Sequence, residues 1–281
     1  MISQEFEYTV PQSLDEALKL LDGGDRKVLA GGMSLIPLMK LRLASPSEVV
    51  DIGRLPGMNG ITESGGTVRI GATATHHDIE TSSVIRAKVP LLAETASHIG
   101  DVQVRNMGTI GGSAAHADPA ADYPAALLAL EALFRVASAK GERTIAAADF
   151  FQDAFTTALE PGELIVEVHV PVEESSEGYR YQKVAHPASG FAVVGVAARV
   201  KKSGNKIVMA RIGVTGMSPR AFRARQAERL LEGGADVAVA AAAVVEGEEA
   251  NSDLYASAGY RRHLARVYAV RALTTALSRA S

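Results

Sequence analysis

The chain has 281 residues, of which 47% are hydrophobic and 22% are charged, as in ordinary globular proteins with room for two or three subdomains. Its formal net charge of −3 gives no reason to expect nucleic acid or an anionic membrane as a partner. The chain contains no cysteine, which excludes disulfides, thiolate catalysis and cysteine-held iron–sulfur clusters within it.

The ends and the apolar runs of the chain carry no targeting signal. Residues 1–5 have neither the basic start nor the apolar core of a signal peptide. No run approaches the roughly 20 apolar residues of a membrane-spanning helix. We therefore expect a cytoplasmic protein.

Residues 1–55 are predicted to form a small α/β unit. A strand alternates through residues 6–10, and Ser13 with Glu16 forms a capping box ahead of a helix that Gly23-Gly24 ends. Further predicted elements are a strand at 27–29, a helix to about 43 and a strand at 48–52.

A Gly-Gly pair directly follows the strand at 27–29, within Ala30-Gly31-Gly32-Met33-Ser34. Paired glycines let backbone N–H groups approach a phosphate closely, and a following helix N-terminus adds favourable partial charge. The hydroxyl of Ser34 adds a further donor. The same pair also suits an ordinary tight turn. It matches neither a Walker A loop nor the three-glycine dinucleotide fingerprint.

Residues 56–175 are predicted to form a second unit, which opens with a hairpin around Ser64-Gly65-Gly66. Helices are expected after the cap Thr75, from Pro90 to Ile99, and over about 122–133. Strands are expected at 134–137 and 164–170. A second Gly-Gly pair lies in Thr109-Ile110-Gly111-Gly112-Ser113. Together, the two pairs predict two backbone cradles that close on one diphosphate.

Residues 176–281 are predicted to form a third unit of three strands followed by helices. The strands are expected at 179–184, 192–200 and 207–214, and the last helix at 263–278. The basic segment 220–229 is interpreted as a solvated helix face. The helical tail carries no recognisable chemistry.

The sequence gives only weak indications of a metal site or of a nucleophilic catalytic site. His116, Asp118 and Asp122 could approach one another as metal ligands, but a turn with capping carboxylates explains them better. Ser34 and Ser113 lie in no Gly-x-Ser-x-Gly elbow, so a serine nucleophile is not expected.

Two long segments resemble a known family. LAGGMSLIPLMKLRLASPSEVVDI and TIGGSAAHADPAADYPAALLALEA are similar to the two flavin-binding segments of the FAD (medium) subunit of molybdenum hydroxylases, which includes the carbon monoxide dehydrogenase medium subunit and the flavin domain of xanthine dehydrogenase. Segments 162–171, 181–183 and 260–265 also resemble the family, in order and at suitable spacing. The resemblance covers nearly the whole chain.

The resemblance implies an α+β fold. It implies a PCMH-type (vanillyl-alcohol-oxidase-like) two-part FAD-binding domain in units 1–55 and 56–175. A C-terminal domain, 176–281, would follow, with a three-stranded antiparallel sheet and a helical bundle.

The resemblance also implies the residues that contact FAD. In the two glycine segments these are Leu29, Ala30, Gly31, Gly32, Met33, Ser34, Leu35, Thr109, Ile110, Gly111, Gly112 and Ser113. Elsewhere they are Ile99, Asp118, Asp122, Ile165, Lys183 and Phe191.

Three of these residues have specific expected roles. The Asp122 carboxylate would accept hydrogen bonds from cofactor hydroxyls. Lys183, or Gln182 if the alignment shifts by one, would place a donor near the isoalloxazine, where a cation stabilises the reduced anionic form. Phe191 either packs near the isoalloxazine or is a core strand residue. The chain has His186 and Gly190-Phe191-Ala192 where relatives carry an arginine and an Asp-Phe-Ala-like string, so one charged contact of those relatives is in doubt.

The implied function is electron transfer. Substrate would be oxidised at a molybdenum cofactor on a large subunit. Electrons would then pass through [2Fe–2S] clusters on a small subunit to FAD in this chain, and on to an external acceptor. The assembly would be a dimerised heterotrimer. Two alternatives remain: a self-contained FAD-dependent reductase resembling UDP-N-acetylenolpyruvoylglucosamine reductase, and a phosphate-binding module without flavin.

Overall fold

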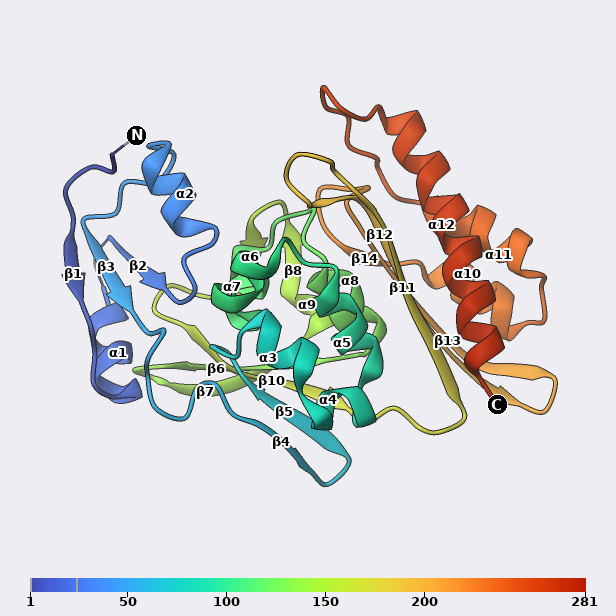
Figure 1. The fold of residues 1–281 in the computed structure, drawn as a ribbon, viewed down its shortest axis with the longest axis horizontal. Helices are drawn as coiled ribbons and strands as arrows, with labels where there is room; N and C mark the ends of the chain where they lie inside the picture. Colours follow the sequence, from blue (N-terminus) through green and yellow to red (C-terminus); the bar gives the residue numbers. More distant parts are fainter. Residues whose placement is uncertain (1, 24) are drawn as a thin grey trace.

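The computed structural model describes residues 2–23 and 25–281 and shows a mixed α and β protein. Three units, each built on its own sheet, follow one another along the longest axis of the molecule (Figure 1). Within the described residues, no helix combines the length and apolar character needed to cross a membrane. One apolar core is shared by the first two units, and a second fills the C-terminal unit.

The N-terminal unit is a parallel three-stranded sheet in the order β1-β3-β2. Only half of the predicted capping box forms: the Ser13 side chain accepts the N–H of Glu16, but the Glu16 carboxylate accepts the N–H of Gln12 instead of that of Ser13. The predicted helix end falls partly on Gly24, which lies outside the described residues. The elements are β1 (Glu7–Thr9), α1 (Leu14–Leu21), β2 (Arg26–Leu29), α2 (Leu35–Lys40) and β3 (Glu48–Asp51).

The middle unit is an antiparallel five-stranded sheet in the order β4-β5-β10-β6-β7, with its helices gathered on one side (Figure 1). Its strands are β4 (Ile61–Ser64), β5 (Thr67–Gly71), β6 (Leu133–Ser138), β7 (Gly141–Ala146) and β10 (Leu164–Pro171), with a separate small ribbon of β8 (Phe151–Asp153) and β9 (Thr156–Thr157). Its helices are α3 (His76–Thr81), α4 (Ser83–Lys88), α5 (Pro90–Ser97), α6 (Val102–Met107), α7 (Ile110–His116), α8 (Tyr123–Ala129) and α9 (Ala147–Phe150).

Helix α8 joins the middle unit to the C-terminal one, and all of its residues are buried. Gly213 packs so closely on it that an added Cβ would lie 1.9 Å from the carbonyl oxygen of Ala125. The hydroxyl of Thr215 donates to the carbonyl oxygens of Pro119 and Ala121, at 2.9 and 2.7 Å. The C-terminal sheet is thereby fixed against the segment that carries Asp122.

The C-terminal unit is a four-stranded antiparallel sheet in the order β11-β12-β13-β14, covered by helices. The expected three strands are present, but the short β14 pairs with Gly213 and Val214 and makes a fourth, so the expected three-stranded sheet was wrong in this detail. The strands are β11 (Glu177–Ala185), β12 (Ala192–Ser203), β13 (Lys206–Thr215) and β14 (Phe222–Arg223). The helices are α10 (Arg225–Glu232), α11 (Val237–Ala242), η1 (Ala243–Val245) and α12 (Ala258–Arg279).

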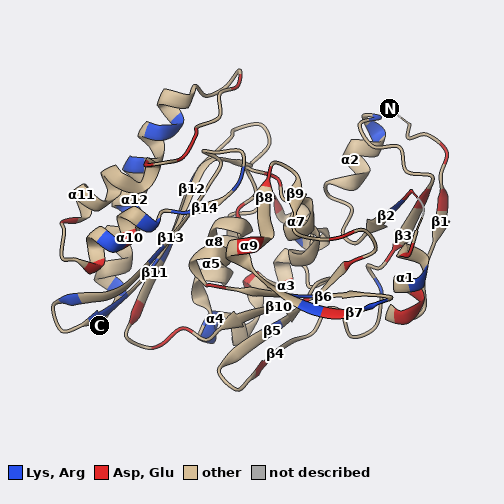
Figure 2. Ribbon diagram, turned by 180° about the vertical axis from the view of Figure 1, so that it is seen from behind, with Lys and Arg blue, Asp and Glu red and all other residues tan. Residues whose placement is uncertain are grey.

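Helix α12 is longer than the expected 263–278 because Ser257 caps it, accepting the N–H of Tyr260. It lies across β11 and β12, where Gly178 leaves room for the carbonyl oxygen of Ala276. Figure 2 shows several basic bands along α12, whereas the segments of the N-terminal unit carry both signs of charge.

Candidate functional site

The first glycine segment, residues 30–34, links the end of β2 to the start of α2. Gly32 has φ +74°, a conformation that L side chains rarely adopt. Within the described structure, the backbone N–H groups from Gly31 to Ser34 donate to no protein acceptor, and the Ser34 hydroxyl makes no capping bond. The segment therefore presents four successive backbone donors and a hydroxyl next to the start of α2.

The second glycine segment was expected as a loop, but it is the first turn of α7. Thr109 caps this helix by accepting the N–H of Gly112 at 3.1 Å. The N–H groups of Ile110 and Gly111 donate to the carbonyl oxygens of Ala74 and Ala72. Its backbone donors are thus already used within the protein, which corrects the expectation of two equivalent backbone cradles.

The two segments meet. A Cβ at Gly31 would lie 1.8 Å from the carbonyl oxygen of Met107, so this position requires glycine to pack on the backbone just before Thr109. Gly111 packs in the same way on Ala72. At Gly112 an added Cβ would lie 2.8 Å from the Thr109 hydroxyl, so this position also packs tightly, but on the side chain that caps α7 and on no backbone atom of another element. The first segment supplies free backbone donors, and the second segment packs behind it.

A second group of predicted site residues surrounds Asp122. Lys183 Nζ donates to Asp122 Oδ2 at 2.8 Å and to the carbonyl oxygen of His98 at 2.9 Å. The hydroxyl of Tyr181 donates to Asp122 Oδ1. The Lys183 and Asp122 side chains are only 3% and 4% exposed. Burial raises the pKa of Asp122, although the ammonium of Lys183 opposes that shift.

This arrangement changes the expectations for the two residues. Both oxygens of Asp122 already accept bonds within the protein, so a direct contact with cofactor hydroxyls stays a prediction. Lys183 is not an isolated charge, because it forms a buried pair. Tyr181 and His98, which the sequence did not single out, hold the pair in place. Tyr181 alternates with Lys183 along β11, and that spacing is the one signal that could have found it.

The remaining predicted residues lie around these two groups. Ile99 follows His98, whose carbonyl oxygen accepts from Lys183, and Phe191 is 42% exposed beside Gly190, which packs on Gly100. Asp118 accepts the N–H of Ala120 in a turn. Ile165 is 3% exposed on β10, paired with Val136 in the core, and its contact with a cofactor stays a prediction.

His76 supports the second glycine segment, a role that the sequence did not predict. Its backbone N–H donates to the carbonyl oxygen of Gly108 at 2.9 Å, and its ring packs edge-on against that of Tyr123, with ring centroids 5.2 Å apart. Burial, together with nearby Arg105, lowers the pKa of His76 to about 4. His76 is therefore neutral at physiological pH and acts as packing, not as a charge.

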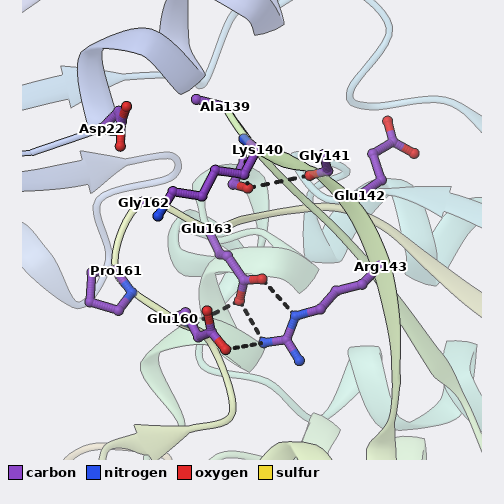
Figure 3. Close-up of a pocket in the computed structure, with 11 residues that line it drawn as sticks. Asp22, Ala139, Lys140, Gly141, Glu142, Arg143, Glu160, Pro161, Gly162 and Glu163 are labelled. Atoms are coloured by element: carbon purple, nitrogen blue, oxygen red, sulfur yellow. Dashed lines mark hydrogen bonds and ion pairs between the residues drawn. The ribbon is translucent and has the colours of Figure 1, made fainter.

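Two hollows in the surface lie away from both groups. One of about 230 Å³ lies between the β6–β7 turn, the segment 160–163 and Asp22, and there Arg143 bonds to Glu163 at 2.6 Å (Figure 3). The other, of about 450 Å³, lies between α8, β14 and α10. No predicted site residue lines either of them, so the candidate site remains the pair of glycine segments and the neighbouring Asp122 group.

Comparison with known proteins gives consistent matches along the whole chain. Residues 4–173 match the family described as the FAD binding domain in molybdopterin dehydrogenase, and residues 179–276 match the CO dehydrogenase flavoprotein C-terminal domain. The carbon monoxide dehydrogenase medium chain of Hydrogenophaga pseudoflava is 41% identical, covering 99% of each chain. The glyceraldehyde dehydrogenase medium chain of Sulfolobus acidocaldarius is 40% identical, covering 97% of this chain and 98% of its own.

Solved structures agree with these matches. A chain of carbon monoxide dehydrogenase from Hydrogenophaga pseudoflava superposes with a TM-score of 0.97 at 42% identity, and one of quinoline 2-oxidoreductase from Pseudomonas putida 86 with 0.94 at 34%, each covering 100% of both chains. The resemblance recognised in the sequence is thereby confirmed. The chain belongs to the family of FAD-binding medium subunits of molybdenum hydroxylases, which are components of oxidoreductases.

Proposed function

We propose that the chain is the electron-transfer subunit of a molybdenum hydroxylase, in complex with a small subunit that carries [2Fe–2S] clusters and a large subunit that carries the molybdenum cofactor. The observation that carries this proposal is the run of four unpaired N–H groups from Gly31 to Ser34, packed against the backbone at Met107. Such a run binds an anion such as a diphosphate. The absence of cysteine from the chain requires the iron–sulfur clusters to be on another polypeptide.

In this proposal, the cofactor's diphosphate lies on the first glycine segment. Its N–H groups and the Ser34 hydroxyl donate to phosphate oxygens, and the missing side chain at Gly112 lets the first turn of α7 come close to the diphosphate. The buried Lys183–Asp122 pair, with Ile99 and Phe191, lies at the isoalloxazine end. When bound, FAD supplies one- and two-electron redox chemistry, and the protein contributes binding, orientation and electrostatics.

The two-part, PCMH-type arrangement of the FAD-binding region is part of the same proposal. Residues 1–55 would supply the donor-rich segment and residues 56–175 the backing segment, with 176–281 as a separate C-terminal domain. The contact of Gly31 with Met107 supports this division, because it joins the first two units at the proposed diphosphate site. In this proposal no side chain need act as a general acid or base, because the redox chemistry belongs to the cofactor and the chain passes electrons from partner clusters to an external acceptor.

The test compares the chain alone with the intact complex. The isolated chain should bind FAD, lack iron–sulfur absorbance, and leave its flavin oxidised when a hydroxylase substrate is added. In the complex, the same substrate should reduce the flavin. Flavin reduction by substrate in the isolated chain would instead support a self-contained reductase.

A further inference from the structure

The turn between β11 and β12, residues 186–191, is closed by its own hydrogen bonds. The N–H of His186 donates to the carbonyl oxygen of Phe191 at 2.7 Å, and the N–H of Gly190 donates to that of His186 at 2.8 Å. Gly190 has φ +73°, so glycine is the residue that accommodates the reversal. The turn holds Phe191 at its end, 42% exposed.

The imidazole of His186 organises the inside of this turn. Its Nδ1 lies 3.3 Å from the backbone nitrogens of Ala188 and Ser189 and 3.3 Å from the Ser189 hydroxyl. In these contacts Nδ1 is the acceptor of the two backbone N–H groups. The His186 side chain therefore accepts N–H bonds of the turn, which backbone carbonyl oxygens would accept if the pairing of β11 with β12 continued.

The outer side of the His186 ring is held by Tyr255, with ring centroids 4.4 Å apart. Tyr255 lies in a turn that Asp253 fixes, because Asp253 Oδ1 accepts its N–H at 2.9 Å. Arg261, from α12, bonds to Asp253 Oδ2 and also donates to the carbonyl oxygens of Val193 and Gly216, at 2.6 and 2.7 Å. The aromatic contact is thus anchored to the sheet itself.

The 186–191 turn lies against the segment that leads to the glycine site. A Cβ at Gly190 would be 3.6 Å from the Cα of Gly100, which precedes α6. The other end of α6, at Met107, contacts Gly31. A helix of this length spans about 9 Å. The turn and the diphosphate segment therefore lie at opposite ends of one short helix.

We propose that His186 is a positioning residue: held by Tyr255, it fixes the 186–191 turn, and with it Phe191, over the isoalloxazine end of the FAD site. This inference rests on the proposed function. The contact between the His186 and Tyr255 rings and the hydrogen bonds to His186 Nδ1 order the turn.

Two substitutions at His186 separate its two contacts. His186→Asn keeps an acceptor for the turn but loses the aromatic contact, and His186→Phe keeps the aromatic contact but loses the acceptor. Tyr255→Leu removes the partner ring. Tyr260→Leu replaces an exposed tyrosine on α12 and is the matched control.

Amide hydrogen exchange of residues 188–190 is measured on the full chain with and without FAD, together with FAD content and the flavin's visible spectrum.

We expect FAD to slow exchange of these amides in the wild type and the control. In His186→Phe, loss of one neutral hydrogen bond should speed exchange about fivefold. His186→Asn and Tyr255→Leu both lose the aromatic contact and keep the acceptor, so they should resemble each other and speed exchange by a smaller factor. FAD content should stay, while the flavin spectrum shifts in all three. Unchanged exchange or spectrum in His186→Phe, or no protection by bound FAD in the wild type, would overturn the inference. A chain that binds no FAD at all would instead refute the proposed function.

Discussion

Glycine occurs in the two site segments for three different physical reasons. Gly31 and Gly111 are needed because backbone atoms of neighbouring elements occupy the space of a Cβ. Gly32 is needed for its positive φ. Gly112 is needed because a Cβ would lie 2.8 Å from the Thr109 hydroxyl, which caps α7 by accepting the N–H of Gly112.

Substitution of these glycines should therefore have separable effects. Gly112→Val should lower FAD content strongly in a protein that still folds, because the new side chain displaces only the Thr109 hydroxyl and projects from the first turn of α7 at the proposed diphosphate site. Gly31→Ala should instead lower the unfolding temperature, because it forces apart the first two units. Flavin-to-protein ratio and thermal unfolding distinguish the two. Full flavin retention in Gly112→Val would contradict the assigned position of the diphosphate.

The Lys183–Asp122 pair makes a prediction about redox potential. Lys183→Met leaves the Asp122 carboxylate buried without its ammonium, so the field at the isoalloxazine becomes more negative and the flavin's midpoint potential should fall. It should also destabilise the fold by about 3 kcal/mol or more, because a buried charge loses its partner.

The double variant Lys183→Met with Asp122→Asn is the matched control. It removes both charges, so potential and stability should return toward the wild type. Gln182→Met tests the neighbouring position and should leave the potential unchanged. A redox titration in which single and double variants agree with the wild type would place the pair away from the flavin.

At the scale of elements, the sequence predicted what local patterns determine. The long strands β10 to β13 follow from alternating apolar residues, and the β12–β13 turn from Ser203-Gly204-Asn205, where Gly204 has φ +59°. Helices α4 and α6 were missed because they bury almost nothing: α4 buries only Ile85 and α6 has no buried residue, so neither has an apolar face. The two-residue β14 exists only through its pairing with β13.

The candidate site was predictable only where a local sequence pattern determines it. The glycine segments could be recognised in the sequence because unusual backbone conformations require glycine. The bonds of Asp122 to Tyr181 and Lys183 join residues about sixty positions apart, and they depend on how α8 packs against the C-terminal sheet. The participation of His76 and the use of the α7 donors likewise follow from tertiary packing, not from a local pattern.

The link between the middle and C-terminal sheets contains a pH-sensitive carboxyl group. Glu173 follows β10, and its Oε1 accepts the N–H of Leu91 in the first turn of α5 at 3.2 Å. Its Oε2 is buried with no protein partner among the described residues. Burial raises the pKa of Glu173 to about 7.

The pKa of Glu173 is higher in the folded state than in the unfolded state. At a pH between the two pKa values, Glu173 therefore holds a proton in the folded protein that it has lost in the unfolded chain. The free energy of unfolding should therefore fall as the pH rises from about 4.5 to about 7, by at most about 3 kcal/mol. Glu173→Gln keeps the acceptor for Leu91 and removes the ionisation, so it should lose this slope and be the more stable protein above pH 7. Denaturant unfolding across this range, with the exposed Glu174→Gln as control, checks it. Parallel pH profiles for wild type and Glu173→Gln would contradict it.

At the scale of the whole molecule, this chain is proposed to bind FAD and transfer electrons, and the iron–sulfur clusters and the molybdenum cofactor are proposed to lie on partner subunits. Among the described residues nothing is arranged as an acid–base or nucleophilic centre beside the glycine site, and cysteine is absent from the sequence. The chain belongs to a family of FAD-binding subunits, and the transfer of electrons between partners is the function proposed for it. Its solved relatives match it over their full length.

The most direct test is purification of the native protein through a tag on this chain, followed by analysis of FAD, iron and molybdenum in each separated subunit. The account predicts that the chain co-purifies with two other polypeptides, that FAD is released from this chain alone, and that iron and molybdenum are found on the partners. A tagged chain that purifies by itself, binds FAD and oxidises or reduces a substrate without iron or molybdenum would contradict the account.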